Sequence, residues 1–375
     1  MRKRKQQMKT IALISDTLPS VKVCDVINGV PKVKHIEKDD IIEFELKYSL
    51  FKKEIKRYNR KTFEEIKWWI LNQKRILRGE SILNFSFKSF ADGSFDYDKT
   101  IGSHTGLHLR EEKADISGGK IKFSDIDVLK NYPDIDTVTI SGLNQETFEY
   151  FILNYGKQLK AIRFFKNKQI EDLFLLGTLP QLEYIYFFAN QKVTQLWDMS
   201  NNTSLTGLGI EDFSKLNSIV GIETAPNLKH FEIGNAIWDT AEIDSFMPLA
   251  NTKIEHLSFS GKKITDNDFS FLSDMSELKE FDFSLHLLTT EQVAWIVANF
   301  PNLKGFALKA RHDCELYKSN EDLSLVPATI IVGKRKPSLK IEGNEERIKN
   351  YELKFESLVT KYKGKKYSEV FSIDK

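Results

Sequence analysis

The sequence predicts an α/β protein built as a repeating solenoid, in which short strands form one parallel sheet. A pattern of three apolar residues recurs eight times between residues 135 and 308, at intervals of 23 to 26 residues. Between these strands the apolar residues change to helical spacing, as at Val293, Ile296 and Phe300. Because one repeat cannot bury its own apolar ridge, neighbouring repeats must stack to form a continuous core.

Each repeat has an apolar residue, two variable residues, a second apolar residue, one variable residue and a third apolar residue. The repeats begin at Ile135, Leu159, Leu182, Leu205, Leu228, Ile254, Leu278 and Leu303. Pro lies two residues before four of these positions, where it can end the preceding helix and start a strand. We therefore expect parallel strands near residues 137–141, 161–165, 184–188, 207–211, 230–234, 256–260, 280–284 and 305–309.

This pattern resembles the L-x-x-L-x-L core of the leucine-rich-repeat family from Ile135 to Leu308. The resemblance implies a horseshoe-shaped solenoid with a concave parallel sheet that binds another macromolecule. The family often has Asn or Cys three residues after the last apolar position, and here only Asn167 and Asn190 match. We therefore expect no continuous asparagine ladder along the solenoid.

Two connections between the repeats have clear helix signals. Asn144 can cap a helix that ends before Gly156, and Thr290 can cap a helix that contains Val293 and Ile296. Other connections, such as 193–204, are too short or irregular for more than a turn of helix.

The chain divides into three predicted regions. Residues 1–100 form an α+β N-terminal domain or cap, with a strand at 41–49, a helix within 62–77 and a hairpin at 83–97. Residues 101–312 form the solenoid. Residues 313–375 form a C-terminal cap and basic tail, with a strand at 328–332, a basic turn at 333–337 and a helix at 345–362. This last region is placed to cover the apolar edge of the final repeat.

Composition favours a soluble, cytoplasmic protein. The two cysteines, Cys24 and Cys314, are far apart in the sequence, so a disulfide framework is not expected and a reducing compartment is the simplest interpretation. The apolar run that follows the basic N-terminus, Ile11 to Ile14, is too short for a signal peptide. No apolar stretch approaches the roughly 18 residues of a membrane helix.

Charge is segregated along the chain. Residues 1–80 carry 20 Lys and Arg against 11 Asp and Glu, whereas residues 81–320 carry 23 against 33. An acidic middle region favours a partner with basic residues, because segregated charge acts on association rather than on fold.

Strand alternation predicts which side chains face a ligand. If the apolar ridge points inward, the residues two, four and six positions after each repeat start lie on the concave face. We expect the binding face to contain Arg163, Phe165, Tyr184, Tyr186, Phe188, Glu211, His230, Glu232, His256, Glu280 and Asp282. Gly207 and Gly209 should leave a trough between the aromatic and the polar rows.

Two parts of this face have alternative interpretations. The aromatic rings either bind a partner or stack on one another across strands. His230, His256 and Glu280 share one offset in three successive repeats. They are suitable metal ligands, but a pH-sensitive contact surface or no special role is favoured over a metal site.

Three classes of function remain. The first is a non-catalytic scaffold that binds a protein or peptide on the concave face, without a cofactor or metal. The second is nucleic-acid binding through basic segments, Lys52 to Lys61 near Trp68 and Lys334 to Lys336. The third is an enzyme. The sequence lacks a phosphate loop, H-E-x-x-H and G-x-S-x-G, so only an active site in the unrecognised N-terminal region would provide catalysis.

Overall fold

The computed structural model describes residues 10–14, 21–27, 30–33, 106–109, 119, 121–131, 137–235, 240–318 and 324–371. The elements predicted at 41–49, 62–77 and 83–97 lie outside these residues. Within the N-terminal region, β1 (Thr10–Ile14), β2 (Val21–Ile27) and β3 (Val30–Val33) form a three-stranded antiparallel sheet in that order.

Eight strands form one sheet, and every neighbouring pair in it is parallel. In chain order they are β4 (Gly106–Leu109), β5 (Thr137–Ile140), β6 (Ala161–Phe165), β7 (Tyr184–Asn190), β8 (Gly207–Phe213), β9 (His230–Gly234), β11 (His256–Ser260) and β13 (Glu280–Phe283). Each strand pairs with the strand of the next repeat, as expected of an α/β solenoid. The first seven predicted strands, β5 to β13, are confirmed.

The eighth predicted strand, at 305–309, is wrong. Only Lys304 forms an isolated bridge with Glu280, and the chain then turns. In a continued strand the Phe306 N–H would donate to a backbone carbonyl of β13. Here it donates to the Asp282 side chain instead, with a hydrogen bond of 2.7 Å to Oδ1, so the backbone ladder stops. The sheet instead has an unpredicted eighth strand, β4, at its other end.

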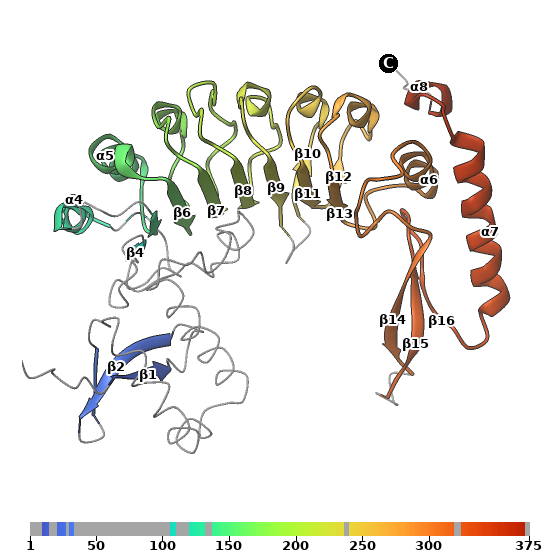
Figure 1. Cartoon of the computed structure of the whole chain (residues 1–375), viewed down its shortest axis with the longest axis horizontal. Helices are drawn as coiled ribbons and strands as arrows, with labels where there is room; N and C mark the ends of the chain where they lie inside the picture. Colours follow the sequence, from blue (N-terminus) through green and yellow to red (C-terminus); the bar gives the residue numbers. More distant parts are fainter. Residues whose placement is uncertain are drawn as a thin grey trace, which may run out of the picture.

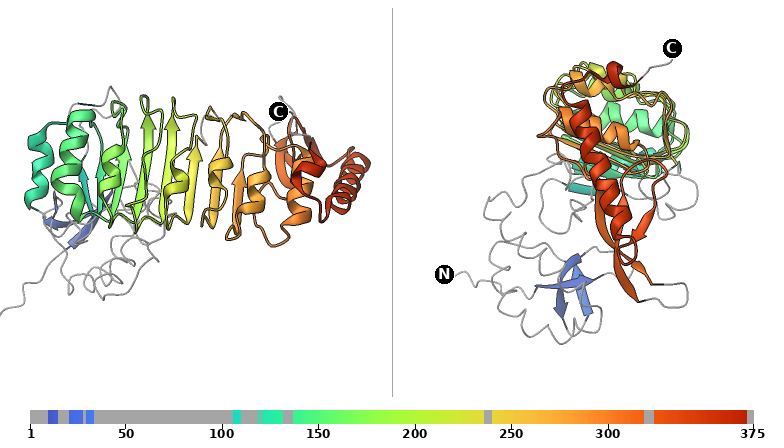
Figure 2. Two further views of the ribbon diagram at one scale, coloured as in Figure 1. Left: turned by 90° about the horizontal axis from the view of Figure 1, so that it is seen from above. Right: turned by 90° about the vertical axis from the view of Figure 1, so that its right-hand side faces the viewer.

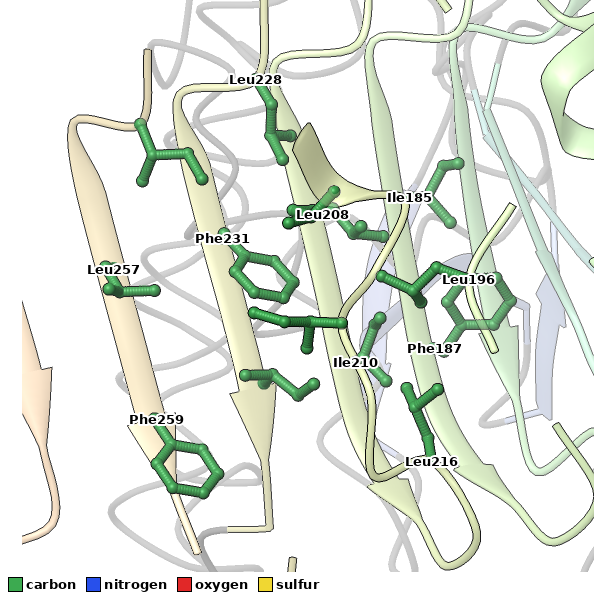
Figure 3. Packing of buried hydrophobic residues seen from close by; sticks show 14 of the residues in the cluster. Ile185, Phe187, Leu196, Leu208, Ile210, Leu216, Leu228, Phe231, Leu257 and Phe259 are labelled. Atoms are coloured by element: carbon green, nitrogen blue, oxygen red, sulfur yellow. The ribbon is translucent and has the colours of Figure 1, made fainter. Parts of the chain in front are cut away.

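The apolar ridge of the repeats forms the core. Leu208, Phe231, Leu257 and Phe281 lie opposite one another in that order on four adjacent strands, and all are buried. Figure 3 shows three of these side chains on the same side of the sheet, with Ile185 continuing the row. The predicted ridge is therefore confirmed.

The connections lie over the other side of this core (Figure 1). The α-helices among them are α4 (Phe123–Ile126), α5 (Gln145–Tyr155) and α6 (Thr290–Asn299). The remaining turns of helix are η2 (Asp127–Asn131), η3 (Gly156–Gln158), η4 (Phe174–Thr178), η5 (Ile222–Thr224), η6 (Met247–Leu249) and η7 (Ser270–Asp274), and β10 (Glu242–Ile243) pairs with β12 (Lys263–Ile264). Asn144 caps α5 as predicted, because its side chain accepts from the Thr147 N–H at 2.9 Å. The cap of α6 is Thr289 rather than Thr290.

Asparagines connect two of the repeats. Asn167 accepts from the Leu143 N–H and donates to the Ile140 carbonyl, both at 2.9 Å. Asn190 donates in the same way to the Asn167 carbonyl of the preceding repeat. The side chains thus satisfy buried backbone groups where the strands end.

The C-terminal region covers the last repeat. β14 (Arg311–Tyr317), β15 (Leu325–Ile331) and β16 (Ser338–Lys340) form an antiparallel sheet, followed by α7 (Glu345–Tyr362) and α8 (Tyr367–Val370). The Trp295 indole N–H of α6 donates to the Lys365 carbonyl at 2.9 Å, and its ring lies against Tyr367. Figure 2 shows α7 and α8 at this end of the repeats. The helix predicted at 345–362 is confirmed.

The described helices contain no segment long and apolar enough to cross a membrane.

The residues immediately before β9, β11 and β13 form a row of ion pairs that the sequence did not predict. Glu255 lies between Lys229 and Lys279 of the neighbouring repeats, with its Oε1 2.8 Å from the Lys229 Nζ. Its side chain is only 18% exposed. Hydrogen bonds from Lys229 and then Lys279 lower the pKa of the Glu255 carboxyl to about 2.

This lowered pKa predicts acid sensitivity. Because the folded pKa lies below the ordinary value of 4.5, the stabilisation from Glu255 is present above about pH 4.5 and is lost as the pH falls towards 2. Urea titrations at pH 5, 4, 3 and 2 should show that the wild type loses more unfolding free energy than Glu255→Gln. A constant difference between the two proteins over this range would contradict the assignment.

Candidate binding face

Strand alternation places the predicted binding residues on the face of the sheet opposite the core. Most of them are partly exposed, whereas the ridge residues between them are buried. On this face β6 contributes Arg163 and Phe165, β7 contributes Tyr184, Tyr186 and Phe188, β8 contributes Glu211, β9 contributes His230 and Glu232, β11 contributes His256, and β13 contributes Glu280 and Asp282. The structure therefore brings all eleven residues onto one surface.

The aromatic rows stack across neighbouring strands. Phe165 and Phe188 are nearly parallel, with ring centroids 5.2 Å apart. The Arg163 guanidinium carbon lies 5.5 Å from the centroid of the Tyr186 ring and 5.9 Å from that of Phe165. The stacking alternative is thus present in the structure, and Phe165 and Phe188 keep part of their surface exposed.

Tyr186 is the buried centre of this group. It is only 8% exposed and packs with Ala161, Tyr184 and Phe188. Its hydroxyl donates a hydrogen bond to Glu211 of β8. Burial, followed by this hydrogen bond, raises the pKa of the Tyr186 phenol. Tyr186 is therefore covered by its neighbours, whereas Phe165, Tyr184 and Phe188 keep part of their surface exposed.

The predicted trough at the glycines is also wrong. Gly207 and Gly209 are buried. Gly209 lies opposite Tyr186 in the strand register, and the Tyr186 side chain extends across β8 to Glu211. Removing two side chains allowed the neighbouring tyrosine to cover the backbone, so the aromatic and acidic rows are joined rather than separated.

A second row contains two histidines and a carboxylate. The His230 and His256 rings are stacked, with centroids 4.3 Å apart and an angle of 10° between their planes. The His256 Nδ1 lies 2.9 Å from the Glu280 Oε2. Burial, and then the neighbouring His256, lower the pKa of His230. The row therefore disfavours a positive charge on the His230 imidazole.

Stacked imidazoles do not point their nitrogens at one common position. In the described part of the chain, no group of three or more His, Cys, Asp or Glu residues is arranged to hold a metal ion.

Phe306 and His312 form a ring pair beyond β13 that the sequence did not predict. Phe306 was expected on the buried ridge, but it is 57% exposed and stacks on His312 with ring centroids 3.8 Å apart. His312 is buried, and its Nε2 has no hydrogen-bond partner in the described structure. Burial lowers the pKa of His312. No periodic signal could have identified this pair, because it depends on the turn after β13.

The sequence predicted two basic segments as the alternative, nucleic-acid-binding surface. The cluster from Lys52 to Lys61 lies outside the described residues. Lys334, Arg335 and Lys336 are exposed in a turn, and the Lys336 Nζ lies 5.3 Å from the centroid of the Tyr351 ring. This ammonium group thus contacts α7 of its own chain.

The comparisons with known proteins identify no family. No family model and no curated protein match the chain. Among solved structures, the chain is similar to one in a crystal structure of a Rad7 and Elc1 complex in yeast. The two chains are 15% identical, with a TM-score of 0.34, and the match covers 70% of this chain and 72% of that chain. A likeness this remote assigns neither family nor function.

Proposed function

We propose that this chain is a non-catalytic leucine-rich-repeat scaffold of the cytoplasm, and that its concave sheet face binds a protein or peptide with basic residues. The observation that supports this best is the side-by-side placement of aromatic rings and carboxylates on one parallel sheet. Phe165 and Phe188 present stacked rings, and Glu232 and Glu280 lie on strands of the same face.

The two kinds of residue contribute differently to binding. Partly exposed aromatic rings provide a large contact area that loses water when a partner binds, as is typical of interaction hot spots. Carboxylates select Lys or Arg and increase the rate of association. Tyr186 connects the two, since its ring packs with Phe188 and its hydroxyl binds Glu211.

The test compares proteins retained from a lysate by the immobilised full chain and by two variants. We expect Phe165→Ala/Phe188→Ala to retain at least about tenfold less of the specific partner, because hot-spot rings contribute most of the binding free energy. Glu232→Gln/Glu280→Gln should mainly remove the salt dependence of retention. Label-free mass spectrometry measures both effects, after nuclease treatment of the lysate.

Matched controls remove the same groups elsewhere. Phe174→Ala removes a ring that is 67% exposed on η4, and Glu345→Gln/Glu356→Gln removes two exposed carboxylates of α7. Equal retention by the concave-face variants and the controls would refute the proposal. Retention of nucleic acid in place of protein would favour binding through the basic segments.

A further inference from the structure

The C-terminal sheet has an open edge at β14. The strand order is β14-β15-β16, so within the described residues β15 is the only strand that pairs with β14. Figures 1 and 2 show these strands projecting from the end of the solenoid, on the side where the parallel strands lie. Among the described residues the seven-residue outer edge of β14 has no paired strand, and such an edge is a template for another strand.

The direction of the backbone groups follows from the hydrogen bonds at the two ends of the hairpin. The Val332 N–H donates to the Ala310 carbonyl at 3.0 Å, and the Lys318 N–H donates to the Ser324 carbonyl at 2.8 Å. In an antiparallel pair these groups alternate between the two sides of a strand. Even-numbered residues of β14 therefore bond to β15, and the N–H and C=O groups of Asp313 and Glu315 point to the open edge.

The side chains along this edge alternate between acidic and less polar. Asp313 and Glu315 are exposed on one face, whereas Cys314 and Leu316 are half-buried on the other. The one cation in the strand, Arg311, forms ion pairs with Asp313 and with Glu352 of α7. The outer edge of β14 therefore presents an acidic and an apolar stripe to an incoming strand.

In the registers that overlap β14 most fully with itself, a second copy of the chain is disfavoured at this edge. A symmetric antiparallel pair centred on any residue from 313 to 315 places two carboxylates directly opposite each other. Like charges in that position are destabilising. A strand with positive charges in the same positions is attracted instead.

We propose that the open edge of β14 binds an extended segment of a partner protein in which Lys or Arg alternates with apolar residues. The segment adds as a fourth antiparallel strand. Its basic side chains lie opposite Asp313 and Glu315, and its apolar side chains lie opposite Cys314 and Leu316. Main-chain hydrogen bonds then provide affinity, and the alternation provides specificity. This site is separate from the concave face and does not depend on the function proposed for that face.

The test uses a fluorescent nine-residue peptide in which Lys alternates with Val, measured by anisotropy with the full chain. Lys opposite Asp313 has its N–H directed at β14, so N-methylation of every Lys nitrogen should weaken binding at least about tenfold through lost hydrogen bonds. N-methylation of every Val nitrogen leaves that edge intact and should change affinity less than about threefold. A peptide with Glu in place of Lys should not bind.

Variants of the protein test the same geometry. Glu315→Pro removes an N–H that points to the open edge, a position where proline is tolerated in edge strands. Glu315→Pro should reduce affinity for the Lys-Val peptide about as much as N-methylation of the Lys nitrogens does. Glu315→Gln keeps the N–H and should lose only the contribution of the charge. Circular dichroism checks that Glu315→Pro is folded. If this variant does not fold, the methylated peptides still test the proposal, because they are measured with the unmodified protein.

Three results would overturn the proposal. The first is equal binding of the two methylated peptides, and the second is absence of binding by the unmodified Lys-Val peptide. The third is a dimer of the full chain, seen by sedimentation velocity, that Glu315→Pro dissociates. This last result would assign the edge to a second copy of the chain.

Discussion

Replacing Phe231 with Ala should lower the free energy of unfolding by about 3–5 kcal/mol. The ring is fully buried at the centre of the apolar ridge, between Leu208 and Leu257 on the adjacent strands. Truncation removes its contacts and leaves a cavity that the paired strands on both sides cannot close. A urea titration followed by circular dichroism measures the change.

Phe174→Ala provides the matched control for this prediction. The same atoms are removed, but from a side chain that is 67% exposed on the opposite layer. Its unfolding free energy should change by no more than about 0.5 kcal/mol. A Phe231→Ala loss below about 1 kcal/mol, or equal losses for the two variants, would show that the ridge is not the structural core.

The parallel sheet could be predicted because its signal is repeated. Each of the seven strands β5, β6, β7, β8, β9, β11 and β13 has apolar residues at the same spacing, and each pairs in the register that this spacing requires. The signal failed at 305–309, where Leu303, Phe306 and Leu308 fit the pattern but the Asp282 carboxylate binds the Phe306 N–H. A side chain that substitutes for a backbone acceptor leaves no trace in hydrophobic periodicity.

The candidate site was predictable in position and less so in detail. Strand alternation placed all eleven residues on one face, since it depends only on backbone geometry. The burial of Tyr186 and its hydrogen bond to Glu211 depend on the orientation of a long side chain over Gly209. The stack of His230 on His256 likewise depends on ring orientation as well as register. Spacing indicates which side chains are neighbours but not how they are oriented.

Replacing Gly234 with Ala should destabilise the protein by more than about 3 kcal/mol, because backbone strain and a steric clash add together. Gly234 ends β9 with a φ of +130°, a conformation that L-residues rarely adopt. A Cβ at this position would lie 1.8 Å from the Ser260 carbonyl oxygen of β11. That oxygen is held in place, since it accepts a hydrogen bond of 2.6 Å from the Asn235 N–H.

Gly343→Ala separates the two causes. Gly343 also has a positive φ, of +78°, but no atom lies within 4 Å of a Cβ built there, so its substitution should cost only about 1 kcal/mol of strain. Urea titration of both variants isolates the clash as the difference between them. Separation of β9 from β11 would also move His230 away from His256, so the NMR signals of these imidazoles should shift in Gly234→Ala and not in Gly343→Ala. Similar stability for the two variants, with unchanged imidazole signals, would mean that β9 and β11 do not approach each other at Gly234 and that the histidine row is not held by this register.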